Sequence, residues 1–459
     1  MIKDLLRKSP YFIRKPLKSI YNNLPDNIKY GRSFTDLYNF LEESQFWSRE
    51  KLEEYQLSEL KKIINHGYNN VPYYKRIFEE RGLTPNDIKD FSDLKKIPYL
   101  TKNIIRKNLK DLIATNYKEK ERLYCTTGGS TGLPLEFCMN KNINIREDAF
   151  IASQWSRVGY DINKKNKMVV LMGHIPPKNY YEFLGNKLIL SSFKLREDNF
   201  KDYVNLIDNF KPDFIHCYPS SIVTLSKYMN NHKIFIKNKN LKAILCVSEN
   251  LYQGQREYIE NTFNCRVYSF YGHSERCCLA GECEINNYYH IFPQYGYTEL
   301  INEDNNENLK EDEIVEIVAT GFNNYAMPFI RYKTEDMAVN TNGTCSCGRN
   351  YKLIKRIEGR KQEFFVNKFG DKITFTRSHF PLAVVKDKIM AYQYVQNKPG
   401  NVILNIETKY NLNEEEINNI KEIFLNMFSN IDIKINRSEK VIERTKAGKF
   451  KYLIQNVKI

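Results

Sequence analysis

One stretch of this sequence decides the fold: Tyr124-Cys125-Thr126-Thr127-Gly128-Gly129-Ser130-Thr131-Gly132-Leu133-Pro134. Glycines let a backbone turn sharply and come close to a ligand. Successive N–H groups and hydroxyls can then surround phosphate oxygens. The stretch is not a Walker A sequence, because Leu133 stands where that motif requires lysine. It therefore predicts a phosphate-binding loop of another kind, placed after a short apolar strand.

Short apolar, β-branched runs alternate with helical stretches beyond this loop. The alternation predicts an α/β fold in which ligands bind at the carboxyl ends of the strands. The strand-like runs are Met168–Met172, Phe214–Tyr218, Ala243–Val247 and Val267–Tyr271, and the helical stretches include Ser220–Met229 and Gln253–Phe263.

The two ends of the chain differ from this middle part. Residues 1 to about 110 read as mostly helical, with helices expected over Leu52–Ile64 and around Tyr74–Arg81. Near the C-terminus, Val402–Ile406, Glu414–Phe428 and Ile431–Ile435 form a β-α-β pattern. A chain of 459 residues is too long for one ordinary core. We expect a large domain over residues 1–360 and a small α+β domain over 361–459, joined by a hinge near Arg360–Glu363.

Four further motifs follow the loop in a fixed order. They are Tyr271-Gly272-His273-Ser274-Glu275, Pro328-Phe329-Ile330-Arg331-Tyr332-Lys333-Thr334-Glu335-Asp336, Glu358-Gly359-Arg360 and Thr445-Lys446-Ala447-Gly448-Lys449. Together with the loop they resemble the motifs of the AMP-forming acyl-activating enzymes, the superfamily of acyl-CoA synthetases and adenylation domains.

A narrower resemblance covers nearly the whole chain. It rests on Asn70-Val71-Pro72-Tyr73-Tyr74, on Pro98-Tyr99-Leu100-Thr101-Lys102 and on Tyr218-Pro219-Ser220. These stretches are similar to those of the phenylacetate–CoA ligase branch, and within it to CapK-like proteins of capsule and surface-polysaccharide biosynthesis. The resemblance implies a large adenylate-forming domain followed by a small mobile lid domain.

The resemblance assigns the binding of ATP to five places. Tyr271 and Gly272 would contact the adenine, with Ser248 and Glu249 lining its pocket, and Asp336 would accept the ribose hydroxyls through a fixed carboxylate. Arg360 would contact the ribose or a phosphate. The β- and γ-phosphates would lie in the loop formed by Thr126, Thr127, Gly128, Gly129, Ser130, Thr131 and Gly132.

The same resemblance names three catalytic residues. Ser274 would donate to the α-phosphate, and Glu275 would bind Mg²⁺, a hard cation suited to carboxylate and phosphate oxygens. Lys449 would enter the cleft from the lid and stabilise charge during adenylation. The family's loop often ends in lysine where this chain has Leu133, and its hinge residue is usually Asp or Lys.

Three departures from the pattern bear on these assignments. The chain has Leu133 in the loop, Glu335 where the family has glycine, and Gln362 at the hinge. Leu133 removes a cation from the loop. Glu335 puts the local backbone geometry in question, and Gln362 bears on the rotation of the lid. His273, at the variable place in its motif, is expected either to take part in the site or merely to pack. Arg331 and Arg356 could be structural ion-pair partners.

A separate set of cysteine and histidine residues predicts a structural zinc site. Cys283 and His290 lie six residues apart, and Cys345 and Cys347 follow further along the chain. Three thiolates and an imidazole make a closed tetrahedral set, and members of the phenylacetate–CoA ligase branch carry a similar arrangement. Cys277 or Cys278 could replace one ligand, and the alternative reading is a group of buried thiols.

The cysteine content and the net charge indicate the location of the protein and the kinds of partner it could bind. Ten cysteines, with no apolar signal segment before them, predict a cytoplasmic protein with mostly reduced thiols. The net charge of +15 attracts anionic partners, but no dense basic run with interleaved aromatics marks a nucleic-acid groove. The basic segment from Leu5 to Lys18 could touch a membrane surface.

The resulting hypothesis is an ATP- and Mg²⁺-dependent ligase for a small carboxylic acid. It would form an acyl-adenylate and pass the acyl group to CoA, to a carrier thiol, or to an amine such as that of an amino sugar. The alternatives are a non-catalytic nucleotide-binding or scaffold protein that keeps the fold and a basic zinc-bearing nucleic-acid binder.

Overall fold

The computed structural model describes residues 11–127, 134–174, 176, 179–252, 254–302, 304, 308–361, 363–375, 378, 381–382, 388–408, 411–437, 442 and 450–457. The chain divides into two compact units, each made of segments that are separate in the sequence. Unit 1 comprises Met1–Asn23, Asn166–Val267 and Gly359–Ile459, and unit 2 comprises Leu24–Lys165 and Tyr268–Glu358. The predicted division at residue 360 stays a prediction, and the last segment of unit 1 begins beside it.

Unit 2 opens with helices and continues into antiparallel strands. Ser48 caps one helix by accepting from the Lys51 N–H, and Pro72 starts the next at the first helical position. Its helices are α3 (Asp26–Tyr30), α4 (Arg32–Ser44), α5 (Arg49–Asn70), α6 (Pro72–Glu80), α7 (Lys102–Lys107) and α8 (Ile143–Ser156). The helices expected over Leu52–Ile64 and Tyr74–Arg81 are confirmed as α5 and α6.

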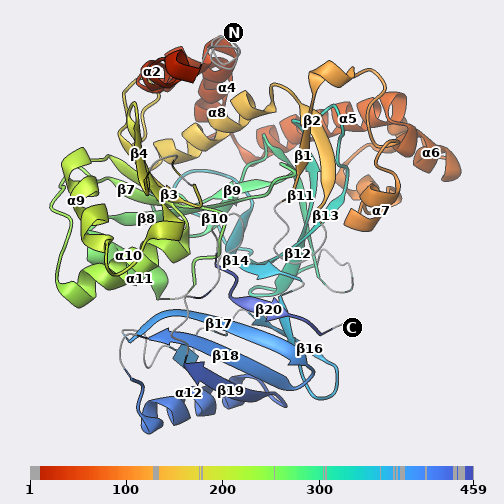
Figure 1. Ribbon diagram of the computed structural model, residues 1–459. Coiled ribbons are helices and arrows are strands. Elements are labelled where there is room, and N and C mark those ends of the chain that lie inside the picture. Colours follow the sequence, from red (N-terminus) through yellow and green to blue (C-terminus); the bar gives the residue numbers. More distant parts are fainter. Residues whose placement is uncertain are drawn as a thin grey trace. The chain divides into compact units, whose positions relative to one another are not determined.

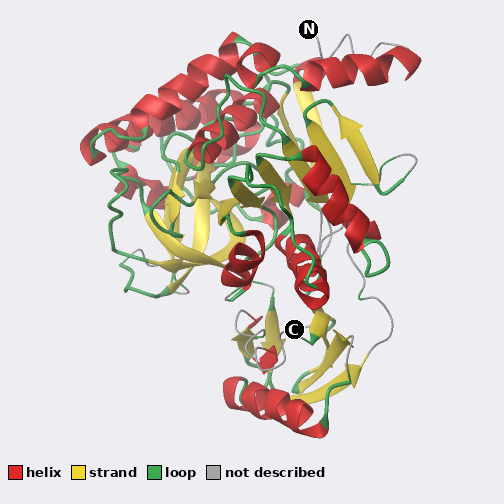
Figure 2. Ribbon diagram, turned by 90° about the vertical axis from the view of Figure 1, so that its left-hand side faces the viewer, coloured by secondary structure: helices red, strands yellow, loops and turns green. Residues whose placement is uncertain are grey.

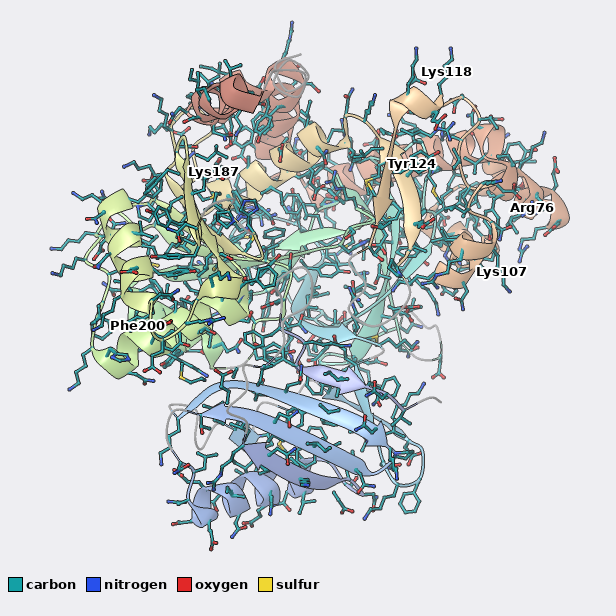
Figure 3. The ribbon with its side chains drawn as sticks, in the orientation of Figure 1. Arg76, Lys107, Lys118, Tyr124, Lys187 and Phe200 are labelled. Atoms are coloured by element: carbon teal, nitrogen blue, oxygen red, sulfur yellow. The ribbon has the colours of Figure 1, made fainter. Side chains whose placement is uncertain are left out.

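The strands of unit 2 form one antiparallel sheet and one hairpin. The sheet has the order β11-β12-β13-β14-β10-β9-β8, and the hairpin joins β1 to β2. Figure 3 labels Tyr124, which is exposed on β1. The bounds are β1 (Arg122–Thr126), β2 (Glu136–Asn140), β8 (Arg266–Gly272), β9 (Leu279–Gly281), β10 (Tyr289–Ile291), β11 (Gly296–Ile301), β12 (Ile314–Gly321), β13 (Tyr332–Asn340) and β14 (Leu353–Arg360).

The middle segment of unit 1 is a parallel α/β layer. Its strand order is β7-β6-β3-β5-β4, parallel except for β4. The elements of this segment are β3 (Met168–Met172), β4 (Tyr181–Leu184), β5 (Lys187–Ser191), α9 (Phe200–Phe210), β6 (Phe214–Cys217), α10 (Pro219–His232), β7 (Ala243–Cys246) and α11 (Gln255–Phe263). The first segment of unit 1 contributes α2 (Tyr11–Asn22). Figure 1 shows α9, α10 and α11 beside these strands.

The C-terminal segment of unit 1 is an α+β layer, as the sequence predicts. Its four-stranded sheet has the order β19-β18-β17-β20, and α12 lies against it, as Figure 2 shows. The elements are β15 (Phe364–Val366), β16 (Lys372–Thr374), β17 (Ile389–Lys398), β18 (Asn401–Thr408), α12 (Glu414–Met427), β19 (Asp432–Arg437) and β20 (Leu453–Gln455). Asn413 and Glu416 form a capping box at the start of α12.

The cores of the two units explain these elements. In unit 2, Leu60 and Ile64 of α5 are buried with Ile317 and Ala319 of the β12 strand. In unit 1, Ile420 and Phe424 bury the apolar face of α12 against β17 and β18. Within the described residues, no helix has the length and apolar character that crossing a membrane requires.

Candidate active site and metal centre

Two of the predicted nucleotide-binding residues meet in unit 2. Tyr271 is buried near the end of β8, and its hydroxyl donates to Oδ2 of Asp336 at 2.8 Å. Burial and the negative charge of Asp336 raise the pKa of Tyr271, so the phenol stays protonated and remains a donor. The two motifs lie 65 residues apart in sequence, and this contact places them together.

Asp336 lies in an irregular part of β13. The pairing of β12 with β13 shifts register between Glu316 and Val318. Inside this irregularity the Thr334 hydroxyl donates to the carbonyl of Ile317 at 2.7 Å and accepts from the Asp336 N–H at 3.1 Å. The two hydrogen bonds of Thr334 therefore fix the backbone that carries the Asp336 carboxylate.

The backbone at Glu335 has the conformation expected of the glycine that the family carries at this position. It has φ +64°, the left-handed conformation that glycine adopts without strain. The side chain forms an ion pair with Lys102, with Nζ 2.6 Å from Oε2. The chain thus keeps a glycine-like backbone at this position although it carries a glutamate.

Glu275 is a buried carboxylate with two side-chain donors. The Tyr332 hydroxyl donates to Oε1 at 2.7 Å, and Nδ1 of His273 lies 3.2 Å from Oε2. The N–H of Cys278 donates to Nε2 of the same imidazole at 3.2 Å, so Nδ1 carries the proton and donates to Glu275. Burial alone would raise the pKa of Glu275, but the hydrogen bonds from His273 and Tyr332 lower it below its usual value.

His273 is therefore a hydrogen-bond partner of Glu275 and does more than pack. The sequence left the role of His273 open because this residue occupies the variable place of the motif. Its position two residues before Glu275 was the one sequence feature that pointed to a contact between them. Ser274, between these two residues, is exposed, as is Gly272. The turn buries the carboxylate and presents the serine to solvent.

The predicted phosphate loop begins at the β1–β2 hairpin. Thr126 ends β1, the Thr127 N–H donates to the carbonyl of Leu135 at 2.9 Å, and the Leu135 N–H donates to Thr127 Oγ1 at 2.9 Å. These bonds close the base of the loop. Gly128, Gly129, Ser130, Thr131 and Gly132 lie outside the described residues.

The remaining predicted nucleotide contacts belong to unit 1. Glu249 accepts from the N–H and hydroxyl of Ser220, at 2.9 and 3.1 Å, and from the Phe450 N–H at 3.1 Å. Ser248 precedes it with φ +68°. Arg360 is partly buried at the end of β14, and Lys449 lies outside the described residues.

Two arginines that the sequence left open are ion-pair partners. Arg331 is buried, and its Nε lies 3.0 Å from Oε1 of Glu299 while Nη1 donates to the carbonyl of Ile97 at 2.7 Å. Arg356 pairs with Glu358 two residues later. Arg331 is therefore a buried structural residue, whereas Arg356 is exposed and its ion pair is local.

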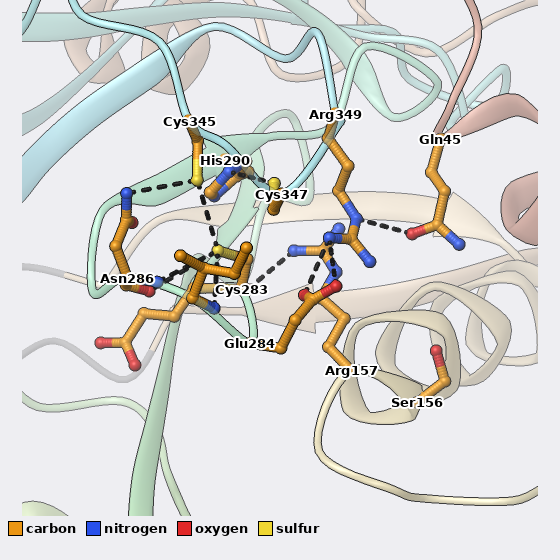
Figure 4. A network of polar contacts seen from close by, with 12 residues as sticks. Gln45, Ser156, Arg157, Cys283, Glu284, Asn286, His290, Cys345, Cys347 and Arg349 are labelled. Carbon is orange, nitrogen blue, oxygen red and sulfur yellow. Dashed lines mark hydrogen bonds and ion pairs between the residues drawn. The ribbon is translucent and has the colours of Figure 1, made fainter.

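Four predicted zinc ligands converge in unit 2 (Figure 4). The ligand atoms of Cys283, His290, Cys345 and Cys347 all lie within 4.8 Å of one another. Cys283 Sγ is 3.6 Å from Cys345 Sγ, and Cys347 Sγ is 3.3 Å from His290 Nε2. Gly348 has φ +82°, so the chain turns immediately after Cys347.

N–H groups donate to two of these sulfurs, although burial raises the pKa of Cys345. The N–H groups of Ile285 and Asn286 donate to Cys283 Sγ at 3.4 and 3.3 Å, and the Asn286 side chain donates to Cys345 Sγ at 3.2 Å. Such N–H···S bonds stabilise negative sulfur. The alternative ligand Cys278 instead accepts from the Thr298 hydroxyl at 3.5 Å.

Hydrogen bonds also leave His290 and Cys347 suited to bind a metal ion. His290 Nδ1 lies 3.0 Å from the carbonyl of Tyr288, so Nδ1 donates there and Nε2 is left as a ligand. Burial raises the pKa of Cys347, but hydrogen bonds from the backbone and side chain of Arg349 outweigh it and lower the pKa. The donor set fits closed tetrahedral coordination of zinc.

Known proteins resemble this chain over most of its length, although no protein-family model matches it. It is 25% identical to Protein CapK from Staphylococcus aureus over 482 residues, which cover 100% of both chains. It is 26% identical to phenylacetate-coenzyme A ligase from Thermus thermophilus over 360 residues, which cover 77% of this chain and 80% of the relative.

A solved structure resembles the fold as well. It is 2-hydroxyisobutyryl-CoA ligase in the postadenylation state with R3-HIB-AMP, at a TM-score of 0.71 and 16% identity. The match covers 90% of this chain and 91% of the ligase. The chain therefore has homologues named phenylacetate-CoA ligase and Protein CapK, and it has the mixed α/β fold of adenylate-forming ligases, as the sequence predicts.

Proposed function

We propose that this protein is an ATP-dependent, AMP-forming ligase that activates a small carboxylic acid. In the first step a carboxylate oxygen attacks the α-phosphorus of ATP, and pyrophosphate leaves. In the second step an acceptor attacks the acyl carbon, and AMP leaves with the oxygen that linked them. Homology to phenylacetate-CoA ligases supports this reaction class.

One observation supports the proposal more than any other. Residues from separate motifs form two linked pairs in one unit, Tyr271 with Asp336 and Glu275 with Tyr332. Tyr332 and Asp336 stand on the same strand, β13. A fixed carboxylate for the ribose hydroxyls and a second, ionised carboxylate beside it are what binding of a metal-nucleotide requires.

Glu275 suits a magnesium ion by its chemistry. Its two oxygens each accept one hydrogen bond, and a carboxylate oxygen has a further lone pair for a cation. Mg²⁺ bound with ATP would neutralise charge that develops on the phosphates. Ser274 would donate to the α-phosphate from its exposed place in the turn, and Lys449 would approach from the small C-terminal domain.

The zinc site has a structural role in this proposal. Four protein ligands leave no open coordination position, so a bound zinc would fasten the segment around Cys283 to the one around Cys347. It would not take part in the chemistry.

The acceptor and the pathway are the finer parts of the proposal. The acceptor is CoA, a carrier thiol or an amine such as that of an amino sugar. The ligase with the similar fold has been solved with 2-HIB-AMP and CoA, which favours CoA. Full-length similarity to Protein CapK favours a role in surface-polysaccharide biosynthesis.

The test is pyrophosphate release with ATP and Mg²⁺ across aryl, short hydroxy, fatty and amino acids, each with and without CoA. We expect release with one class of acid and faster release when the right acceptor is present. ATP binding without release from any acid would instead favour the non-catalytic nucleotide-binding protein.

A further inference from the structure

A hollow lined by uncharged polar side chains lies between two helices of unit 1. Its volume is about 350 Å³, which falls within the roughly 300–1,000 Å³ that small-molecule sites occupy. The helices are α10 and α11, which Figure 1 shows side by side. The residues that line the hollow are Asn230, Asn231, Tyr258, Asn261 and Thr262.

The hollow lies at the opposite edge of the parallel layer from Glu249. α10 begins at Pro219, directly after β6, and α11 ends at Phe263, shortly before β8 begins at Arg266. A helix that connects parallel strands runs back from their carboxyl ends toward their amino ends. Glu249 follows the carboxyl end of β7, where ligands of such layers bind. The hollow, near the ends of both helices, is therefore a separate place on the layer.

Hydrogen bonds hold the wall between the two helices. Nδ2 of Asn230 on α10 donates to Oγ1 of Thr262 on α11 at 2.8 Å. The hydroxyl of Thr262, which is buried, donates in turn to the carbonyl of Tyr258 at 2.7 Å. Because these bonds fix two lining side chains in advance, binding a ligand there would require little further ordering.

The other two asparagines keep their hydrogen-bonding capacity. Asn261 is exposed, and its side-chain amide bonds to no other group in the described part of the chain. Nδ2 of Asn231 lies 3.8 Å from Sδ of Met390, and a thioether is a weak acceptor. Neither asparagine caps its helix, since the residues at the C-caps are Lys233 and Asn264. Their amides are therefore available to a ligand.

The chemistry of the hollow suits the hydroxyl groups of a sugar. A hydroxyl both donates and accepts hydrogen bonds, and a side-chain amide does the same. The five described lining residues carry no charge, and the C-terminal ends of α10 and α11 have partial negative charge. Both features disfavour a phosphate or a carboxylate. The ring of Tyr258 offers an apolar face against which the C–H groups of a sugar ring can pack.

We propose that this hollow binds a neutral monosaccharide or one neutral sugar unit of a glycan. Asn231 and Asn261 would form hydrogen bonds with its hydroxyls, and Tyr258 would contact a face of its ring. The inference does not rest on the proposed function, because the hollow shares no residue with the nucleotide site. Binding there would hold a glycan on the protein without making or breaking a bond.

The test measures the binding of methyl glycosides of glucose, galactose, mannose and N-acetylglucosamine. Saturation-transfer NMR would detect contact, and calorimetry would compare wild type with Asn261→Ala, Tyr258→Ala and Tyr258→Phe. We expect at least one glycoside to bind and both alanine variants to weaken its binding roughly threefold or more. Tyr258→Phe keeps the ring and should bind more tightly than Tyr258→Ala. Asn261 is exposed, so the melting temperature of Asn261→Ala should match that of wild type.

The matched control is Asn205→Ala, which removes an exposed asparagine from the neighbouring helix α9 and should bind as wild type does. Saturating ATP with Mg²⁺ should leave the sugar affinity unchanged. Absence of binding by every glycoside would overturn the proposal, as would wild-type affinity in both Asn261→Ala and Tyr258→Ala. Competition by ATP would place the sugar in the nucleotide site and would also overturn it. Because pyrophosphate release is not measured, failure of the proposed ligase reaction would leave this result intact.

Discussion

Single residues in this protein hold backbone conformations that their side chains do not favour, and they do so beside the proposed nucleotide site. Glu335 and Arg276 both have positive φ. Each side chain has a charged partner on another element: Lys102 for the first and Glu147 for the second. Both ion pairs are partly buried, and the left-handed backbone costs a residue with a side chain roughly 1–2 kcal/mol.

Glu335 allows the backbone contribution to be measured separately. Glu335→Gly and Glu335→Ala both remove the ion pair with Lys102, and only glycine relieves the left-handed strain. We expect the glycine variant to be more stable by about 1 kcal/mol, a melting temperature higher by roughly 2–4 °C. Differential scanning fluorimetry would measure it.

Lys333, two residues earlier on β13, is the matched control because its φ is not positive. There the order should reverse, since glycine weakens an ordinary strand. An alanine variant at Glu335 that melts at or above the glycine variant would contradict the strained geometry.

At the scale of elements, strands buried in the parallel layer were predictable. The runs at Met168, Phe214 and Ala243 became β3, β6 and β7 with ends displaced by one residue at most, because such strands read as continuous apolar runs. The β-α-β order at the C-terminus was equally clear, since α12 carries a capping box and an amphipathic face.

Other elements could not be read from local pattern. β9 and β10 have only three residues each, and their pairing depends on contacts between distant segments. The sequence located the carboxylates of the site through motifs, but it could not show that His273 donates to Glu275 or that Arg276 turns toward α8. Those facts depend on side-chain directions in one turn, which residue types alone do not determine.

The zinc cluster joins short elements that have little core of their own. We expect about one zinc per purified chain. Cys347→Ser should lose the metal and lower the melting temperature by roughly 5–10 °C, because metal binding stabilises only the folded state. Elemental analysis together with thermal melting would measure both effects.

Cys265→Ser is the matched control, because this partly buried thiol lies in unit 1, outside the cluster. It should keep its zinc. The zinc site would be contradicted if protein purified without chelator contained no zinc. It would also be contradicted if the Cys347→Ser variant kept one zinc per chain.

At the scale of the whole molecule, the predicted site residues are divided between the two units. Tyr271, Glu275 and Asp336 belong to unit 2, whereas Glu249, Arg360 and Lys449 belong to unit 1. We propose that Lys449 acts in the first step and not in the second.

Lys449→Ala tests whether Lys449 acts in adenylation and not in acyl transfer. We expect acid-dependent pyrophosphate release to fall by roughly 100-fold or more, because a cation that stabilises transition-state charge is lost. Transfer from a supplied acyl-adenylate to CoA should stay within a fewfold of wild type. Lys451→Ala, two residues along the same basic segment, is the control and should leave both steps unchanged. Equal loss in both steps would contradict a role confined to adenylation.

Activation through an acyl-adenylate is tested most directly by following a carboxylate oxygen. The acid that supports pyrophosphate release would be supplied with ¹⁸O in its carboxyl group, together with ATP, Mg²⁺ and acceptor, and the products analysed by mass spectrometry. Attack on the α-phosphorus followed by acyl transfer leaves one ¹⁸O in AMP, and we expect this label. Unlabelled AMP, or ¹⁸O in phosphate with ADP as the nucleotide product, would contradict activation through an acyl-adenylate.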